Sequence, residues 1–486
     1  MKSKILFIAV LLMAGALTLG CSKEDVVPKV PADNVVTLTT TVSLVETKAL
    51  DPNGKKTFKA GDKIAVVYEN ESNAMVKAES AELPSGTYGK SATFSVTLTN
   101  PKASGDLHII YPATMAKDDG DVNYDALATQ DGSLSTLGDN LDLAMFEGSL
   151  TASKELPESI ALTNRLAICA FTLKNSDGTD EITSSITGLL VYDGTNSYYV
   201  SRAPAAGPIY VAIRPVSGVN IEYTAKSNAG YYVKTVTGKT YEANNLYPLG
   251  LRMTALPQGM LPGKFSVSST DKVYFSKGNL QYVGTSWQFA TNQWDFFGDN
   301  QSDGHRDLFG WGTGDAPNKV STGSSDYSSF TDWGTNPITN GGNTANYWRT
   351  PTRSEWFYVI DSRTTTSNLL YAKATVNGVG GIILLPDDWS ASYHALTSAN
   401  DPEVAFTTNI VNAATWESDF EAHGAVFLPA AGYRTSSYGN DDNGYWSQSS
   451  YDSYNARYLH FHTGNVEASY VSRSTGYSVR LVKVVE

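Results

Sequence analysis

Residues 35–45 read VVTLTTTVSLV, and this stretch determines the fold expected for the first half of the chain. Valine and threonine favour extended backbone, and the partial alternation of apolar and hydroxyl side chains predicts a strand with one buried face. Similar short runs recur, divided by Gly, Asn, Pro and Ser, at residues 63–68, 92–98, 107–111, 166–173, 188–192, 209–213 and 221–225. Because no convincing amphipathic helix lies between them, this spacing predicts β-sandwiches rather than a parallel sheet.

The composition limits the class of protein. The 486 residues are enough for roughly two to four domains. A hydrophobic fraction of 41% excludes a disordered chain, and a net charge of −13 argues against a general affinity for nucleic acid or anionic lipid. Two cysteines exclude a disulfide-rich scaffold, an iron–sulfur cluster and a four-cysteine zinc site.

Tryptophan divides the chain in two. All nine tryptophans lie between Trp287 and Trp446. Pro and Gly in residues 257–263 (PQGMLPG) interrupt any periodic pattern just before this region and predict a hinge. We therefore expect three domains, over residues 34–160, 161–255 and 263–486, of which the first two are β-sandwiches.

Four short motifs in the first part resemble fimbrillin-type pilins. Residues 47–49 (TKA) and 58–66 (FKAGDKIAV) are similar to the N-terminal region of members of that family. Residues 164–170 (NRLAICA) are similar to the start of the second domain in that family, and residues 246–249 (LYPL) are similar to its end. The resemblance implies two transthyretin-like β-sandwiches, export as a lipoprotein, and assembly with stalk pilin subunits by donor-strand exchange.

In that scheme a protease cuts after a basic residue behind the first strand, the strand leaves, and a partner's strand fills the groove. The resemblance places the cut at Lys48, where family members generally carry Arg, and Lys55 and Lys56 are further candidates. An added strand restores both the backbone hydrogen bonds and the apolar cover of such a groove. The alternative is that residues 35–45 stay as a permanent strand of a lipoprotein that is never cleaved.

The N-terminal residues predict export. A short basic start precedes an uncharged apolar run at residues 5–19, which is too short to span a bilayer comfortably and is typical of a signal peptide. Cys21 follows Gly20 and resembles the acylated cysteine of bacterial lipoproteins. We therefore expect a lipoprotein signal peptide over residues 1–20 and a lipid anchor on Cys21. An ordinary signal peptide with an incidental cysteine is the alternative.

Residues 22–25 (SKED) resemble the acidic export signal of Bacteroidota-type surface lipoproteins. That resemblance implies a place on the outer face of the outer membrane, whereas a plain solvated linker is the alternative. Pro28 and Pro31 stiffen the segment, so residues 21–33 are expected to form a semi-rigid tether.

The C-terminal part contains two predicted helices, over residues 353–361 and 413–423. In residues 347–356 (YWRTPTRSEW), Thr352 and Glu355 have the spacing of a capping box. The helix after this element and the closing residues (GYSVRLV) resemble the C-type-lectin-like fold of the bacterial major-paralogous-domain family and of the formylglycine-generating enzymes. The expected fold class is therefore mainly β, with two transthyretin-like β-sandwiches followed by an α+β C-type-lectin-like domain.

Enzymatic function is not expected. The formylglycine-generating enzymes use paired cysteines late in the domain, and this chain has no cysteine after Cys169, which itself is expected to be a buried core thiol. The sugar-binding triplets of calcium-dependent lectins are also absent. We expect no cofactor and no metal, although a structural calcium on loop carboxylates is an alternative. Asp299, Asp303 and Asp307 are interpreted as solvated loop carboxylates. His460 and His462 are interpreted as surface or packing residues.

A loop-rich segment near the C-terminus predicts a binding surface. Aromatic rings stack on sugars and are favoured at protein interfaces, and Asn and Asp accept hydrogen bonds from hydroxyl groups. The candidate ligand-binding residues are Tyr438, Asp441, Asn443, Trp446, Tyr451 and Tyr454. For Trp446 the alternative is a place in the core of the domain.

Together these features predict a surface lipoprotein at the tip of a pilus. The first two domains would accept a donor strand, and the C-terminal domain, which ends in a strand predicted over residues 479–485, would bind an extracellular glycan or a host or bacterial surface protein. One alternative is a non-polymerising outer-membrane lipoprotein that binds the same ligands. A remote alternative is an enzyme of unrelated chemistry on a formylglycine-generating-like fold.

Overall fold

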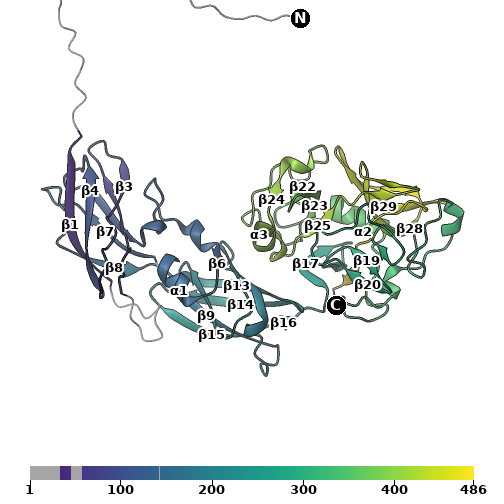
Figure 1. Ribbon diagram of the computed structural model, residues 1–486, viewed down its shortest axis with the longest axis horizontal. Helices are drawn as coiled ribbons and strands as arrows, with labels where there is room; N and C mark the ends of the chain where they lie inside the picture. Colours follow the sequence, from purple (N-terminus) through teal and green to yellow (C-terminus); the bar gives the residue numbers. More distant parts are fainter. Residues whose placement is uncertain (1–32, 45–56, 142, 486) are drawn as a thin grey trace, which may run out of the picture.

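Three β-rich parts follow one another along the chain in the computed structural model (Figure 1). The structure describes residues 33–44, 57–141 and 143–485. The predicted signal peptide, most of the tether, Cys21, Lys48, Lys55 and Lys56 lie outside these residues. Within them, no helix is both long enough and apolar enough to cross a membrane. The prediction of a mainly β chain is confirmed.

The first part is a seven-stranded sheet with the order β3-β2-β5-β7-β8-β1-β4. It curls until its two edges approach each other, where Ser80 bridges Val96. Alternate side chains fill the enclosed core, in keeping with the period of an extended strand. The strands are β1 (Val35–Leu44), β2 (Ala65–Glu69), β3 (Met75–Glu79), β4 (Ser91–Thr99), β5 (Asp106–Tyr111), β7 (Ala144–Ser149) and β8 (Ser159–Asn164).

The second part is a sandwich of a three-stranded and a six-stranded sheet. The smaller sheet contains β9 (Ala167–Lys174), β12 (Ile209–Ile213) and β15 (Leu246–Arg252). The larger sheet contains β6 (Thr129–Gln130), β10 (Ile186–Tyr192), β11 (Ser197–Ser201), β13 (Val216–Ser227), β14 (Gly230–Tyr241) and β16 (Thr254–Ala255). Every run that the sequence predicted as a strand in the first two parts is a strand.

The boundary between these two parts differs from the prediction. A division between residues 160 and 161 would cut β8, which belongs to the first sheet. Residues 113–141 also lie between the two parts, and Leu127, Leu137 and Leu141 share one hydrophobic cluster with Val67 of the first sheet and Leu189 of the second sandwich. The two sandwiches are therefore joined by a continuous apolar core.

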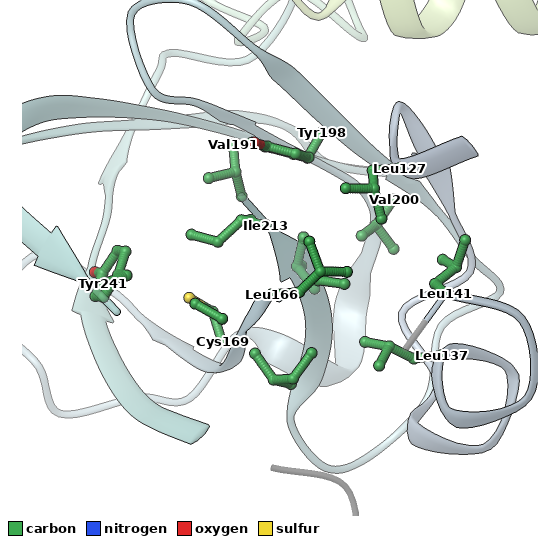
Figure 2. Packing of buried hydrophobic residues seen from close by; sticks show 14 of the residues in the cluster. Leu127, Leu137, Leu141, Leu166, Cys169, Val191, Tyr198, Val200, Ile213 and Tyr241 are labelled. Atoms are coloured by element: carbon green, nitrogen blue, oxygen red, sulfur yellow. The ribbon is translucent and has the colours of Figure 1, made fainter. Parts of the chain in front are cut away.

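Cys169 lies in the centre of that cluster, among Leu166, Val191, Ile213 and Tyr241 (Figure 2). It is a free, fully buried thiol, which confirms the prediction. Burial raises the pKa of the thiol far above its usual range, so the reactive thiolate does not form at neutral pH.

The C-terminal part contains several small sheets around two aromatic clusters. Its strands are β17 (Met260–Ser266), β18 (Lys272–Ser276), β19 (Leu280–Val283), β20 (Ser286–Phe289), β21 (His305–Arg306), β22 (Tyr371–Val376), β23 (Val379–Leu384), β24 (Ile410–Val411), β25 (Val426–Pro429), β26 (Tyr433–Arg434), β27 (Tyr438–Gly439), β28 (Asn443–Ser450), β29 (Asn455–His462), β30 (Asn465–Ser472) and β31 (Val482–Val484). The hinge predicted over residues 257–263 overlaps the first strand of the C-terminal part, because β17 starts at Met260. The predicted last strand is shorter than expected and pairs with β18.

Both predicted helices of this part are present. Thr352 and Glu355 form the predicted capping box at the start of α2 (Arg353–Phe357), which continues into η7 (Tyr358–Ser362). The second consists of α3 (Ala413–Thr415) and η9 (Trp416–Glu421) and ends near Gly424, whose φ of 85° suits glycine. The other helical turns are η1 (Ala113–Met115), η2 (Tyr124–Leu127), α1 (Leu134–Thr136), η3 (Leu137–Leu141), η4 (Thr183–Ser185), η5 (Ser324–Tyr327), η6 (Trp333–Thr335) and η8 (Phe406–Thr408).

A buried carboxylate joins the second sandwich to the C-terminal part. Glu421, at the end of η9, accepts hydrogen bonds from Lys226 Nζ (2.9 Å) and the Tyr231 hydroxyl of the sandwich. Its second oxygen accepts bonds from Gln293 Nε2 (3.0 Å) and Trp416 Nε1 (3.1 Å) of its own domain. Burial alone would raise the pKa of Glu421, but the Lys226 ammonium and these hydrogen bonds lower it to about 2.

Aromatic contacts extend this joint. His423 stacks on Tyr393 with ring centroids 3.6 Å apart, and its Nε2 lies 3.1 Å from the Ser197 hydroxyl of the sandwich. The Tyr192 ring of the sandwich meets Tyr393 edge-on at 5.0 Å. Burial lowers the pKa of His423 to about 3, so this ring is neutral at physiological pH.

Replacing Glu421 with glutamine tests the joint. The depressed pKa means that the stabilising contribution of the carboxylate is fully present above its ordinary pKa of 4.5 and is lost as the pH falls toward about 2. We expect the free energy of unfolding at pH 7 to fall by about 3 kcal/mol in the variant, and this difference from the wild type to disappear near pH 2. Urea unfolding followed by tryptophan fluorescence reports the C-terminal part, which holds all nine tryptophans.

Glu417→Gln is the matched control, because Glu417 contacts the same ammonium at 2.9 Å but has a more exposed side chain. Its loss should cost less than about 1 kcal/mol. Equal effects of the two variants would show that Glu421 is not the centre of the joint.

Candidate strand-exchange site and binding surface

Strand β1 is an inner strand of the first sheet, with a neighbour on each side. It pairs antiparallel with β4 over nearly its whole length, from Val35 opposite Thr99 to Ser43 opposite Ser91. On its other side, Thr41 to Leu44 pair in parallel with β8. Removing β1 would therefore leave unpaired backbone groups on two strands at once.

The two faces of β1 differ in chemistry. Thr40, Val42 and Leu44 are buried and Leu38 packs at the margin of the same core. The outer face is a ladder of hydroxyl pairs with β4: Thr37 with Thr97 at 3.0 Å, Thr41 with Thr93 at 3.4 Å, and Ser43 with Ser91 at 2.7 Å. Each buried Val or Leu side chain contributes about 1.5–3 kcal/mol, so β1 is a substantial part of the core.

The segment that carries the predicted cleavage sites connects two anchored stretches. Leu44 is buried on one side of it. On the other side Phe58 is buried between the rings of Phe94 and Tyr111, with centroids 5.2 and 5.1 Å away. A cut at Lys48, Lys55 or Lys56 would leave β1 attached to the remainder of its sheet by noncovalent contacts alone.

Two predicted ligand-binding residues are part of the core. Trp446 is fully buried, and its Nε1 donates to the Phe309 carbonyl at 2.6 Å, so the prediction that it contacts a ligand is wrong and the core alternative holds. Asn443 is 3% exposed; its side chain accepts from Gly432 N at 3.0 Å and donates to the Phe461 carbonyl at 3.3 Å. The amide therefore links β28 to β29 and to the segment before β26, and is not available to a ligand.

The remaining loop candidates lie nearer the surface. Asp441 is exposed, whereas Tyr438 is half-buried in the small β26–β27 hairpin, where burial raises its pKa. The neighbouring Asp442 accepts hydrogen bonds from the Tyr477 hydroxyl and from His460 Nε2, both at 2.6 Å. Burial alone would lower the pKa of His460, but Asp442 raises it above its usual value.

No group of three potential metal ligands occurs among the described residues. The rings of His460 and His462 lie 5.0 Å apart, and His460 is occupied by Asp442. Asp307 is fully buried and accepts from Phe297 N and Gln301 Nε2, at 2.7 and 2.6 Å. Burial raises its pKa to about 6, and the carboxyl organises its own loop.

Tyr451 and Tyr454 are the predicted candidates that the structure exposes, by 45% and 62%. Tyr451 stacks on Tyr470, with ring centroids 4.0 Å apart, and the Arg457 guanidinium lies 4.2 Å from the Tyr451 centroid. We call Tyr451, Arg457 and Tyr470 the tyrosine platform. Arg457 and Tyr470 were not among the residues predicted from the sequence; the β29–β30 register places them opposite each other.

The tyrosine platform offers flat ring faces held in place by stacking and a cation–π contact. Such faces match the C–H faces of pyranose rings and the apolar surfaces of proteins. Tyr454, in the turn between β28 and β29, adds an exposed ring beside these strands. Tyr438 and Asp441 share no hydrogen bond, ion pair or ring contact with the platform within the described part of the chain.

Paired substitutions separate core from surface in this region. Trp446→Ala should lower the free energy of unfolding by about 3–5 kcal/mol, because it opens a large cavity. Tyr454→Ala should change it by less than about 0.5 kcal/mol, because the ring is mostly in solvent. Chemical denaturation of both variants measures the difference, and similar values would contradict the assigned roles.

No protein-family model matches the chain, and no curated protein matches it. Solved fimbrial structures are similar to it at low identity. A fimbrial protein from Bacteroides ovatus is 10% identical with a TM-score of 0.22, over 93% of this chain and 99% of that one. A fimbrial assembly protein from Parabacteroides distasonis is 10% identical with a TM-score of 0.26, over 50% and 96%. The tip fimbrial protein Mfa3 from Porphyromonas gingivalis is 12% identical with a TM-score of 0.23, over 46% of this chain and 96% of that one.

Because these TM-scores are low, the similarities are not used to infer function, which is inferred from the geometry of this chain.

Proposed function

We propose that this chain is a surface adhesin that is exported as a lipoprotein and joins the tip of a pilus by strand exchange, in which β1 leaves together with the lipid-bearing N-terminus. The observation that carries this proposal is the position of β1, an inner strand with an apolar face that precedes the segment bearing Lys48, Lys55 and Lys56. Loss of β1 would create a groove with free backbone groups on β4 and β8, and a strand from a stalk pilin would fill it.

The groove specifies its partner. The incoming strand replaces Leu38, Thr40, Val42 and Leu44, so it needs small or apolar side chains at every second position. Its outward side chains are best short and hydroxylated, because they meet the Thr and Ser ladder of β4. A shift of one residue would turn the apolar set toward solvent, so register is strongly selected.

The engagement of β31 in its own domain supports the proposed tip position. This strand pairs with β18, and Val482 is buried and exchanges backbone hydrogen bonds with Arg349. Because β31 is paired within its own domain, it is not available as a donor strand to another subunit. The chain thus accepts a strand through its first sandwich and presents its C-terminal part, which we propose to be C-type-lectin-like, to the outside.

Adhesion itself is assigned to the tyrosine platform together with Tyr454. Their ring faces would stack on an extracellular glycan or on a surface protein of a host or bacterial cell. No catalytic role is proposed for the chain. The outer-membrane location is proposed from Cys21, with lipid on its thiol and amine as the anchor.

Strand exchange is tested with β1 itself as the probe. The chain is cut within residues 45–56, the released strand is removed in mild denaturant, and a synthetic peptide of residues 33–48 is added. We expect the peptide to rebind and restore the melting temperature. A Val42→Asp peptide should bind at least about 100-fold more weakly, because it buries a carboxylate in the groove.

Thr41→Asp is the matched control peptide, since the same charge at the next position points outward and should weaken binding far less. Failure of the cut protein to release or rebind β1 would contradict strand exchange. It would favour a surface lipoprotein that never polymerises. In that case sheared pili would lack the protein and the outer-membrane fraction would hold all of it.

Ligand binding is tested on a glycan and matrix-protein array with the full chain. Tyr451→Ser and Tyr470→Ser should each weaken the captured ligand at least about tenfold, which corresponds to the loss of one stacked aromatic contact. Tyr347→Ser, at a ring outside the platform, should leave capture unchanged. Binding that survives both platform substitutions would place the ligand site elsewhere.

A further inference from the structure

A cleft of about 630 Å³ lies on the seam between the second sandwich and the C-terminal part. The turn between β13 and β14, with Asn228 at its tip, forms one side, and residues around Lys277, Trp294 and the start of η9 form the other. The volume falls within the roughly 300–1,000 Å³ of small-molecule sites, which occur preferentially between domains.

Glu421, the buried carboxylate of the cleft, has no capacity left for a ligand. Glu421 already accepts from Lys226, Tyr231, Gln293 and Trp416, two donors for each carboxylate oxygen. Lys226 also contacts Glu417 at 2.9 Å. Lys226 is therefore compensated by two carboxylates and Glu421 is saturated, so an anionic ligand would be recognised by other groups of the cleft.

Counting the described residues alone, Lys277 is the charged group in the cleft without a direct partner. Its side chain is half-buried, and its ammonium makes no hydrogen bond or ion pair with any described residue. Burial lowers its pKa; the more distant Glu421 opposes this effect and Lys226 adds to it. A half-buried ammonium that lacks a hydrogen-bonding partner is destabilised, and an entering carboxylate would relieve that cost.

Beside Lys277 the cleft combines one indole with short polar groups. Trp294 is half-buried against an aromatic cluster and lines the cleft. Its turn is held rigidly, because Asp295 accepts from Asn292 N at 2.8 Å and the buried Gln293 bonds to Glu421. Thr291 and Asn228 are exposed at the rim and offer hydroxyl and amide groups.

We propose that this cleft binds a saccharide that carries a carboxylate. The acid pairs with the Lys277 ammonium, the sugar ring packs on Trp294, and the hydroxyl groups bond to Asn228 and Thr291. The site is separate from the tyrosine platform, because it is built from both sides of the interdomain seam. It would let one chain hold an acidic glycan independently of the platform's ligand.

Isothermal titration of the full chain tests the proposal with two matched pairs of sugars. Digalacturonate is compared with its methyl ester, and sialyllactose with lactose. We expect at least one acidic sugar to bind at least about tenfold more tightly than its uncharged counterpart. Lys277→Met should remove that preference, and Asn228→Ala should weaken the acidic sugar at least about threefold.

Lys239→Met is the control, since Lys239 lies on β14 outside the cleft, and Tyr451→Ser controls for the platform. Both should leave the titration unchanged, so failure of the platform and failure of the cleft are distinguishable. Three results would overturn the proposal: no binding of either acidic sugar, equal binding of charged and uncharged partners, or acidic-sugar binding that Lys277→Met leaves intact. Because Lys277→Met removes a half-buried charge, its fold is expected to be retained, and circular dichroism checks this.

Discussion

The buried Glu421 carboxylate is the interaction on which the arrangement of the molecule depends. It receives two donors from the second sandwich and two from the C-terminal part, so neither domain alone satisfies it. A buried carboxylate deprived of partners is costly, and this cost penalises any separation of the two domains. The seam cleft exists because the domains are held at this fixed spacing, and residues of the network line it.

The interdomain joint and strand β1 are held in place by different kinds of contact. The joint depends on contacts between residues far apart in the sequence, so no single segment of the chain contains all of its partners. Strand β1 contributes through a simple alternating pattern, with Val42 and Leu44 inside and threonines outside. Many sequences satisfy such a pattern, and the proposed strand exchange requires no more than this of the incoming strand.

Local features of the fold were predictable, and non-local ones were not. The alternation in β1 and the Thr352–Glu355 capping box depend on neighbours within one strand or one turn, and both were found from the sequence. Trp446 lies in a Gly- and Asn-rich stretch typical of a surface loop, yet its indole fills the core below β28. The partnership of Arg457 with Tyr470 needs the β29–β30 register, and that of Glu421 with Lys226 spans 195 residues.

The pairing of β1 also has a mechanical meaning. The chain enters the first sandwich at the start of β1, and the second sandwich lies toward the opposite end of that domain (Figure 1). In the uncleaved chain, a pull between the proposed anchor at Cys21 and a ligand held by the C-terminal part would act along the strand, while its hydrogen bonds to β4 lie across it. The whole ladder from Val35 to Ser43 shares the load, so the sheet resists by shear instead of opening one pair at a time.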